Sequence, residues 1–237
     1  MRKKMWLGGM LVMLSLVLGG AAAAVAATSE SAANAGVGTL TVKIGRVEIQ
    51  RSGQAVYAPA EKGGLIYEGD KIKTGELARA AILLDDGSLI RLNANSELLV
   101  KDKKPGKQKS RLQLMLGQLW AKVTKQENSL EIETPSAVAA IKGTQLELIF
   151  TPDGKTVLIV WDGLVNLSNA LGRLLVHAGE QGTAGKNGAP VVIPVDLKSL
   201  DQWFETVVEV PATQTLKTTV KDKNGKEQTL DLKYNKK

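Results

Sequence analysis

Short apolar runs of alternating residues recur along most of this chain, and each run ends at a cluster of Gly, Asp, Asn or Lys. Ala80, Ile82 and Leu84 alternate up to the sequence Asp-Asp-Gly-Ser at 85–88, and the alternation resumes beyond it. A period of two residues is typical of a half-buried strand, and an acidic-glycine pair between two such runs indicates a hairpin. No long pattern of helical period occurs before Leu197. The chain is therefore predicted to be all-β, with mainly antiparallel short strands.

Two further hairpins and one bend are predicted by the same reasoning. Pro-Asp-Gly at 152–154 and Asn-Gly at 224–225 each separate a pair of alternating runs, and both sequences favour tight turns. Leu112, Leu114 and Leu116 share one parity, whereas Leu119, Ala121 and Val123 share the other, and Gly117 lies where the parity changes. Because a shift of one residue moves side chains to the opposite face, a bulge or sharp bend is expected at Gly117.

One short helix is predicted over Asp196–Val207. Asp196 is a residue type that caps helices through its side-chain oxygen. The residues at helical spacing on one face are Leu197, Leu200, Trp203 and Phe204. This helix is expected to precede the C-terminal β-hairpin.

The N-terminus has the pattern of a cleaved export signal. Basic residues at 2–4 precede an apolar run over 5–18, and small residues at 24–26 offer a cleavage site. The apolar run is shorter than the roughly 20 residues that span a bilayer. We expect an exported protein, periplasmic, cell-surface or secreted, without a stable membrane anchor. The chain has no cysteine, which excludes a lipid anchor, disulfides and thiolate metal sites.

Composition divides the chain into four parts. Residues 1–26 form the predicted signal peptide, and residues 27–38, rich in Ser, Ala, Asn and Gly, are expected to be a flexible linker. The main β domain is predicted over 39–195, and 196–237 form an extension of helix and hairpin. These boundaries leave one domain large enough to bury a core.

The charge balance is weakly basic. The formal net charge is +7, and removal of the signal peptide with Arg2, Lys3 and Lys4 lowers it to +4, too little to indicate nucleic acid binding. The strongest local cluster consists of Lys101, Lys103, Lys104, Lys107, Lys109 and Arg111. It is a candidate contact for a polyanion or a partner, although a solvated loop is the commoner role of such a run. It contains no aromatic residue on which a base would stack.

Residues suited to catalysis do not form a recognisable constellation. His177 is the only histidine, so neither a histidine zinc site nor a catalytic triad can be assembled around it. Asp85 and Asp86 are adjacent at a predicted turn, where their carboxylates diverge. The sequence 182–186 resembles a phosphate-binding loop, but Asn187 stands where the magnesium-binding Ser or Thr is required. We expect no enzyme activity, no metal and no cofactor.

Three tryptophans in the mature chain are candidates for stacking on sugar rings. Trp120, Trp161 and Trp203 each lie in an apolar-patterned segment, which favours packing in the core instead.

Dispersed motifs between Gly45 and Gly182 resemble the extracytoplasmic domain of the FecR family. They include Gly-Arg-Val-Glu-Ile at 45–49, the segment 65–75, and Ile-Lys-Gly-Thr-Gln-Leu at 141–146, which is similar to the family's Gly-Thr-x-Phe motif with leucine in place of the aromatic residue. The resemblance implies a solenoid-like or sandwich FecR-type domain. The motif residues expected at structural turns are Gly69, Asp70, Gly75, Gly87, Gly143, Thr144, Gly163 and Gly179.

Three functions are compatible with these features. The leading hypothesis is a non-catalytic exported FecR-type module that binds a protein partner or a cell-envelope polymer. The alternative, implied by the resemblance, is the extracytoplasmic sensor component of a signalling system of the sigma and anti-sigma type. An envelope hydrolase is disfavoured because no acid-base constellation is present.

Overall fold

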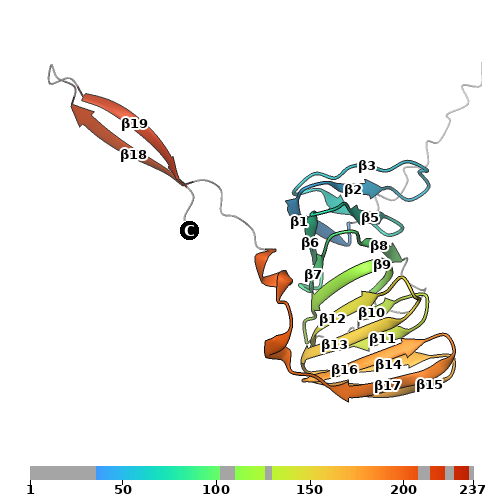
Figure 1. The fold of residues 1–237 in the computed structure, drawn as a ribbon. Helices are drawn as coiled ribbons and strands as arrows, with labels where there is room; N and C mark the ends of the chain where they lie inside the picture. Colours follow the sequence, from blue (N-terminus) through green and yellow to red (C-terminus); the bar gives the residue numbers. More distant parts are fainter. Residues whose placement is uncertain (1–35, 102–109, 126–129, 208–213, 222–226, 235–237) are drawn as a thin grey trace, which may run out of the picture. The chain divides into compact units, whose positions relative to one another are not determined.

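The computed structural model describes residues 36–101, 110–125, 130–207, 214–221 and 227–234, with side chains described up to residue 207. Strands dominate this part of the chain, as the alternating pattern predicts (Figure 1). The strands are β1 (Gly38–Ile44), β2 (Val47–Gln50), β3 (Ala58–Pro59), β4 (Leu65–Ile66), β5 (Lys71–Thr74), β6 (Arg79–Leu84), β7 (Leu89–Leu92), β8 (Glu97–Lys101), β9 (Arg111–Lys122), β10 (Leu130–Glu133), β11 (Val138–Ile141), β12 (Gln145–Phe150), β13 (Thr156–Asp162), β14 (Leu164–Asn169), β15 (Gly172–His177), β16 (Glu180–Gly185), β17 (Gly188–Pro194), β18 (Gln214–Lys221) and β19 (Glu227–Tyr234).

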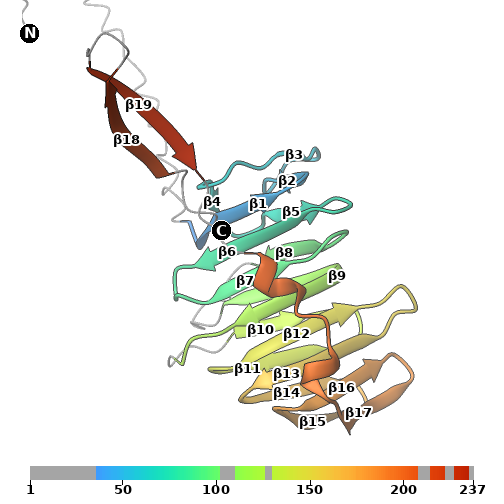
Figure 2. The same cartoon turned by 60° about the vertical axis from the view of Figure 1, so that its left-hand side comes forward.

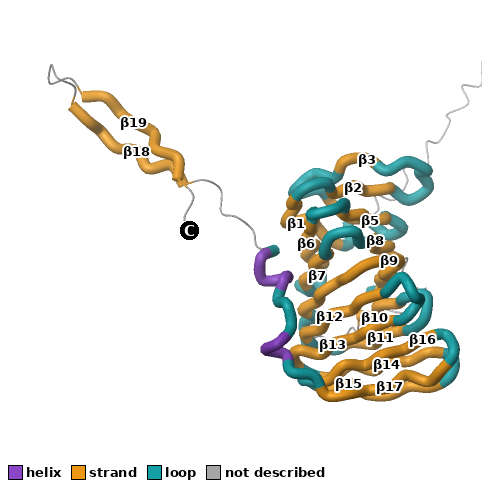
Figure 3. The backbone as a smooth tube through the Cα atoms, viewed as in Figure 1, coloured by secondary structure: helices purple, strands orange, loops and turns teal. Residues whose placement is uncertain are grey.

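The first seventeen strands form two sheets that pack face to face (Figure 3). Sheet A has the order β4-β1-β6-β7-β9-β12-β13-β16-β17, and sheet B has the order β3-β2-β5-β8-β9-β10-β11-β14-β15. Strand β9 belongs to both sheets. Its first half pairs with β8 and its second half with β7. The arrangement is therefore a stack of strand pairs whose two sheets share one continuous strand.

The change of sheet inside β9 occurs at Gly117, where the sequence predicts a bend. Gly117 has a φ of 88°, and the buried residues change parity from Leu112 and Leu114 to Leu119 and Ala121. A side chain at position 117 would overlap the backbone of Asn95 and Ser96. Glycine is therefore required both by this close backbone approach and by its positive φ. The prediction of a bend at this residue is confirmed.

Elsewhere the chain changes sheet at short corners that stack on one another. In the first half, Gly75 donates to the carbonyl of Arg46, and Asn95 donates to the carbonyl of Gly75. In the second half the corners lie at the opposite edge, because Gln145 of β12 pairs with Lys122 at the far end of β9. Each corner thus satisfies backbone groups of its neighbour, as buried turns must.

One continuous core lies between the sheets. Inward positions alternate with outward ones in most strands, for example in β8, where Leu98 and Val100 are buried between half-buried neighbours. Nearly all the buried side chains are aliphatic, including Ile72, Leu92 and Leu130, which are fully inaccessible. Burial of aliphatic side chains of this kind is the main stabilising contribution to a fold of two sheets.

The segment Asp196–Val207, called the strap below, crosses the outer face of sheet A (Figure 2). The prediction of a single helix is wrong, because the strap forms two short 3-10 helices, η1 (Leu197–Ser199) and η2 (Trp203–Thr206). A 3-10 helix rises about 2.0 Å per residue against about 1.5 Å in an α-helix. The same number of residues therefore extends farther across the strands of sheet A. Asp196 does cap η1, since its carboxylate accepts from the backbone of Lys198.

The remaining predictions about the chain's ends have mixed outcomes. Strands β18 and β19 pair as the predicted C-terminal hairpin and form a sheet of their own. The predicted linker 27–38 extends too far, because Gly38 begins β1 and Val37 packs against the core. The predicted signal peptide 1–26 lies outside the described residues. No helix in the described ranges is long and apolar enough to cross a membrane.

Candidate partner-binding face

The outer face of sheet B carries polar and charged residues at the alternating positions that point away from the core. Neighbouring strands place these residues directly opposite one another, so they form rows across the sheet. One row, read from β8 to β15, consists of Lys101, Arg111, Glu131, Ala140, Asn166 and Leu175. The strap packs against sheet A and not against this face.

Four charged residues form a fixed cluster in the middle of this face. Lys101 Nζ lies 2.6 Å from Glu133 Oε2, and Arg111 donates to the other carboxylate oxygen of Glu133. Arg111 also lies near Glu131, with 3.9 Å between Nε and Oε2. Burial raises the pKa of Glu133, but the hydrogen bonds from Lys101 and Arg111 outweigh it and hold that pKa below its ordinary value.

This cluster changes the interpretation of the predicted basic contact. Lys101 and Arg111 both pair with Glu133, and Glu131 lies near Arg111, so two carboxylates balance the two positive charges that were expected to contact a polyanion. The other predicted contacts, Lys103, Lys104, Lys107 and Lys109, lie outside the described residues. The sequence analysis missed the acidic partners because they belong to β10, whose parallel pairing with β9 no local pattern indicates.

Beside the cluster lies a shallow open trough of about 570 Å³ over β10, β11, β14 and β15. It forms where three small or medium residues, Val138, Ala140 and Ser168, occupy outward positions between longer side chains. Its polar rim includes Glu131, Asn166, Asn169 and Arg173. A wide, shallow and mixed surface of this kind suits a macromolecule better than a small ligand, which needs an enclosing pocket.

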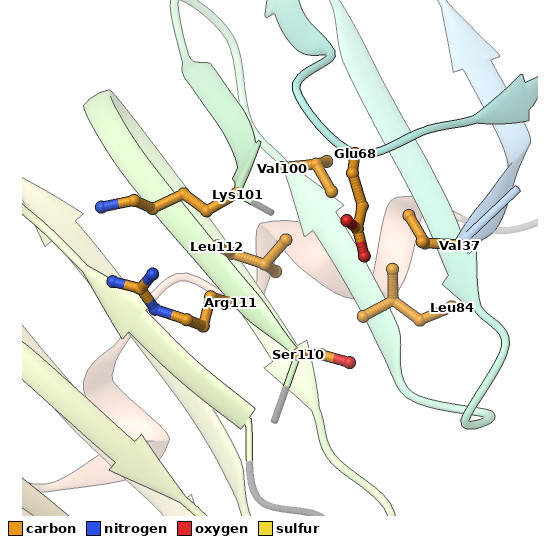
Figure 4. A pocket seen from close by; sticks show the side chains of 8 residues that line it. All are labelled: Val37, Glu68, Leu84, Val100, Lys101, Ser110, Arg111 and Leu112. Atoms are coloured by element: carbon orange, nitrogen blue, oxygen red, sulfur yellow. The ribbon is translucent and has the colours of Figure 1, made fainter. Parts of the chain in front are cut away.

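A second hollow, lined by Val37, Glu68, Leu84 and the ends of β8 and β9, is too small for a ligand (Figure 4). It has room for about 20 Å³, enough for one water molecule. Glu68 extends toward it, while the charged ends of Lys101 and Arg111 point away. Nothing in this geometry indicates binding of a cofactor.

The outer face of sheet A is covered by the strap. Trp203 and Phe204 of η2 pack with Val42, Ala81 and Trp120 in a second hydrophobic cluster. The ring of Phe204 stacks on Trp120, with centroids 4.8 Å apart. Trp120 and Trp203 are each 3% exposed, so these two tryptophans pack as expected and offer no ring to a sugar.

A buried carboxylate lies under the strap. Glu147 of β12 is 2% exposed and accepts from Trp203 Nε1 at 2.6 Å and from the Gln118 side-chain amide. Burial, reinforced by the charge of Asp201, raises the pKa of Glu147, although hydrogen bonds to the carboxylate oppose the shift. Sequence reasoning missed this residue, because a glutamate at an outward strand position ordinarily faces water.

Replacing Glu147 with glutamine is expected to stabilise the protein at neutral pH. The unfolded carboxyl titrates near 4.5, and the folded one titrates higher, so the folded state binds the proton more tightly. The stabilisation from this group is therefore complete below 4.5 and is lost as pH rises through the folded pKa. Urea unfolding of both proteins between about pH 4 and pH 8 measures this. The advantage of Glu147→Gln should grow with pH, and a constant difference would contradict the assignment.

The residues singled out for chemistry are not brought together. His177 is exposed, and its backbone N–H donates to Glu180 Oε2 at 2.7 Å. Asp86 accepts from the backbone of Ser88 at the tip of the β6–β7 hairpin. The sequence 182–185 lies inside β16 and is no phosphate-binding loop. Across the described ranges, no group of three or more His, Asp or Glu residues could hold a metal ion.

The motif residues expected at turns lie in the corners between strands or form hydrogen bonds or ion pairs that hold those corners. Asp70 is 1% exposed, pairs with Arg51 at 2.6 Å and accepts from the backbone of Tyr67, so it fixes the turn before β5. Thr144 donates to the carbonyl of Leu164 across two corners. Gly75 lies against Arg46. Among these motif residues, the glycines with positive φ are Gly69, Gly87, Gly143, Gly163 and Gly179.

Comparisons with solved structures identify the same architecture. Two crystal structures of an anti-sigma factor candidate from Parabacteroides distasonis ATCC 8503 match this chain with a TM-score of 0.50 and 17% identity. The match covers 56% of this chain, and it spans 64% of one neighbour and 63% of the other, slightly under two thirds. At this identity the likeness shows the fold alone. No curated protein matches the chain.

The family model described as "FecR protein" matches residues 70–166. The matched range begins immediately before β5 and ends within β14, so it includes the shared strand β9 and corners of both halves. It lies within the range over which the motifs resemble the family. The match therefore identifies a FecR-type domain within this chain, over residues 70–166.

Proposed function

We propose that this chain is an exported, non-catalytic FecR-type module that acts in signalling by binding a protein partner on the outer face of sheet B. The observation that carries the proposal is the contrast between the two outer faces. The strap packs over β1, β6, β7, β9 and β13 of sheet A, whereas sheet B presents the trough beside the cluster of Lys101, Arg111, Glu131 and Glu133. Fixed charges beside an open surface provide specificity for a complementary protein.

A cell-envelope polymer is the less favoured ligand. Trp120 and Trp203 are buried between the strap and sheet A, and Lys101 and Arg111 are compensated by the two carboxylates of Glu131 and Glu133. The described residues that line the trough include no aromatic ring on which a sugar would stack, and Arg173 is their one basic residue.

The test compares two matched variants of the full-length protein. Ser168 and Thr183 are both half-buried hydroxyl residues on β-strands, Ser168 in the trough and Thr183 on the outer face of sheet A. A photo-crosslinker at Asn166 identifies the bound protein, whose affinity for purified variants is then measured. We expect Ser168→Arg to weaken binding at least about tenfold and Thr183→Arg to leave it within about twofold.

The outcomes separate the components of the proposal. Equal affinity of the two variants would exclude the trough, and a crosslinked glycan without protein would exclude a protein partner. Export is tested on the same material, because the recovered chain should begin near Ala27. An intact Met1 would contradict cleavage of the signal.

A further inference from the structure

The C-terminal end of the stack exposes two strand edges that differ in their ability to pair. Strand β17 ends sheet A and β15 ends sheet B, and within the described part each pairs with a neighbour on one side only. An unpaired edge presents a row of N–H and C=O groups that can bind another strand. The direction of those groups follows from the hydrogen bonds at the strand ends.

The edge of β17 is protected. The Val195 N–H donates to the carbonyl of Gly179 at 2.9 Å. Because backbone groups alternate in direction along a strand, those of residues 193 and 191 also point toward β16. Pro190, Val192 and Pro194 therefore direct their backbone nitrogens to the open side. Two of these three are prolines and have no N–H, which leaves a single donor and disfavours strand addition.

The edge of β15 is not protected in this way. Ala178 donates to the carbonyl of Gly163, so residues 176 and 174 face β14, while Arg173, Leu175 and His177 face outward. The His177 N–H is already bound by Glu180. Arg173 and Leu175 keep outward N–H and C=O groups, and the Leu175 side chain is 50% exposed. This short window is an acceptor for one extended strand.

The described part of the same chain also contains a sheet that lacks a third strand. Strands β18 and β19 have eight residues each and pair only with one another there. An isolated two-stranded hairpin is marginally stable in water and gains stability from an additional strand. The hairpin therefore lacks a third strand, and β15 lacks a neighbour on its open side.

We propose that the β15 edge binds the β18–β19 hairpin of a second copy of this chain. The hairpin of the same chain is disfavoured by length. Thr206 is held to Arg79 of β6, and β15 lies about six strand spacings away, roughly 29 Å, in the other sheet about 10 Å behind. The eight steps from Thr206 to Gln214 reach at most about 29 Å, and only on a straight path through the protein body. A second copy has no such constraint.

This contact joins two different surfaces, so it is heterologous and generates rings or open chains of molecules. Each copy contributes one acceptor edge and one donor hairpin. The proposed edge adjoins the trough, because Arg173 belongs to both, but strand pairing at the edge does not require a partner at the trough.

The two edges supply a matched pair of variants. Leu175→Pro removes an outward N–H from the open edge, and Val192→Pro removes the equivalent group from the protected one, in neither case a bond to the neighbouring strand. We expect the wild-type protein and Val192→Pro to assemble with rising concentration in analytical ultracentrifugation. Leu175→Pro should raise the dissociation constant at least about tenfold, with a thermal melt close to that of Val192→Pro.

A mixing experiment tests the head-to-tail geometry. Thr218→Pro interrupts β18 and should also abolish self-assembly. Leu175→Pro keeps an intact hairpin and Thr218→Pro keeps an intact acceptor, so an equimolar mixture should form a one-to-one complex. Because the chain has no cysteine, separate Leu175→Cys and Thr218→Cys chains should also form a mixed disulfide even if a proline variant misfolds.

The proposal is overturned if the wild-type protein stays monomeric at every soluble concentration, or if Leu175→Pro assembles as well as Val192→Pro. Failure of the mixture and of the mixed disulfide would likewise overturn it. Wild-type crosslinks that form within one chain, independent of concentration, would show that the hairpin binds its own body instead.

Discussion

Replacing Gly117 with valine is expected to destabilise the whole stack by about 3–5 kcal/mol. The residue has a φ of 88°, which a β-branched side chain tolerates poorly. A Cβ atom there would lie 2.7 Å from both the carbonyl oxygen of Asn95 and the Cα of Ser96, so a corner of backbone would have to move. Thermal and urea melts measure the loss. Both sheets should melt together, because the strand that bends at this residue belongs to both.

Gly154 provides the control for this prediction. Its φ is 80°, close to that of Gly117, but a Cβ atom at that position would meet nothing within 4 Å. Gly154→Val should therefore show only the backbone cost, of order 1–2 kcal/mol. If both glycine variants lost the same stability, the close approach at Gly117 would be unimportant.

Replacing Trp203 with alanine is expected to release the strap while the two sheets remain folded. The change removes a buried aromatic ring and the hydrogen bond to Glu147, and truncation of a buried tryptophan costs about 3–5 kcal/mol. Water can then reach Glu147. Limited proteolysis should cut within Asp196–Val207 much faster than in the wild type, with little change in the circular dichroism of the β body.

Trp203→Phe separates the ring from its N–H. It keeps most of the packing against Phe204 and loses only the bond to Glu147, so its effect should be about 1–3 kcal/mol. Continued protection of the strap in Trp203→Ala would show that Arg79 and Arg91, which bond to Thr206 and the Phe204 carbonyl, hold it without the tryptophan.

Local features of the fold could be predicted from the sequence because the residues that cause them are neighbours in the chain. The hairpin at 85–88 and the bend at Gly117 depend on turn residues beside alternating runs. The parallel pairing of β10 with β9 depends on segments that contact only after the chain crosses between sheets. The alternation of apolar residues does not indicate such a contact, so the ion pairs of Glu133 could not be predicted.

The strap shows a different limit. The spacing of Leu197, Leu200, Trp203 and Phe204 fits an α-helix. It also fits two short 3-10 helices, of which the second buries Trp203 and Phe204. Which of the two forms depends on the sheet beneath, and the sequence of the strap does not contain that information. For the same reason Glu147 looked like a surface residue, since its burial is imposed by a segment more than 50 residues away.

The strand shared by both sheets has a mechanical consequence. Packed layers often adjust to a ligand by sliding past each other over small distances. Here β9 hydrogen-bonds in both layers, and sheet-changing corners at opposite edges link the layers on either side of it. Sliding would have to break these bonds together. The two layers therefore move as one rigid plate, and a force applied at the trough is passed to the strap on the far side as displacement of the whole body.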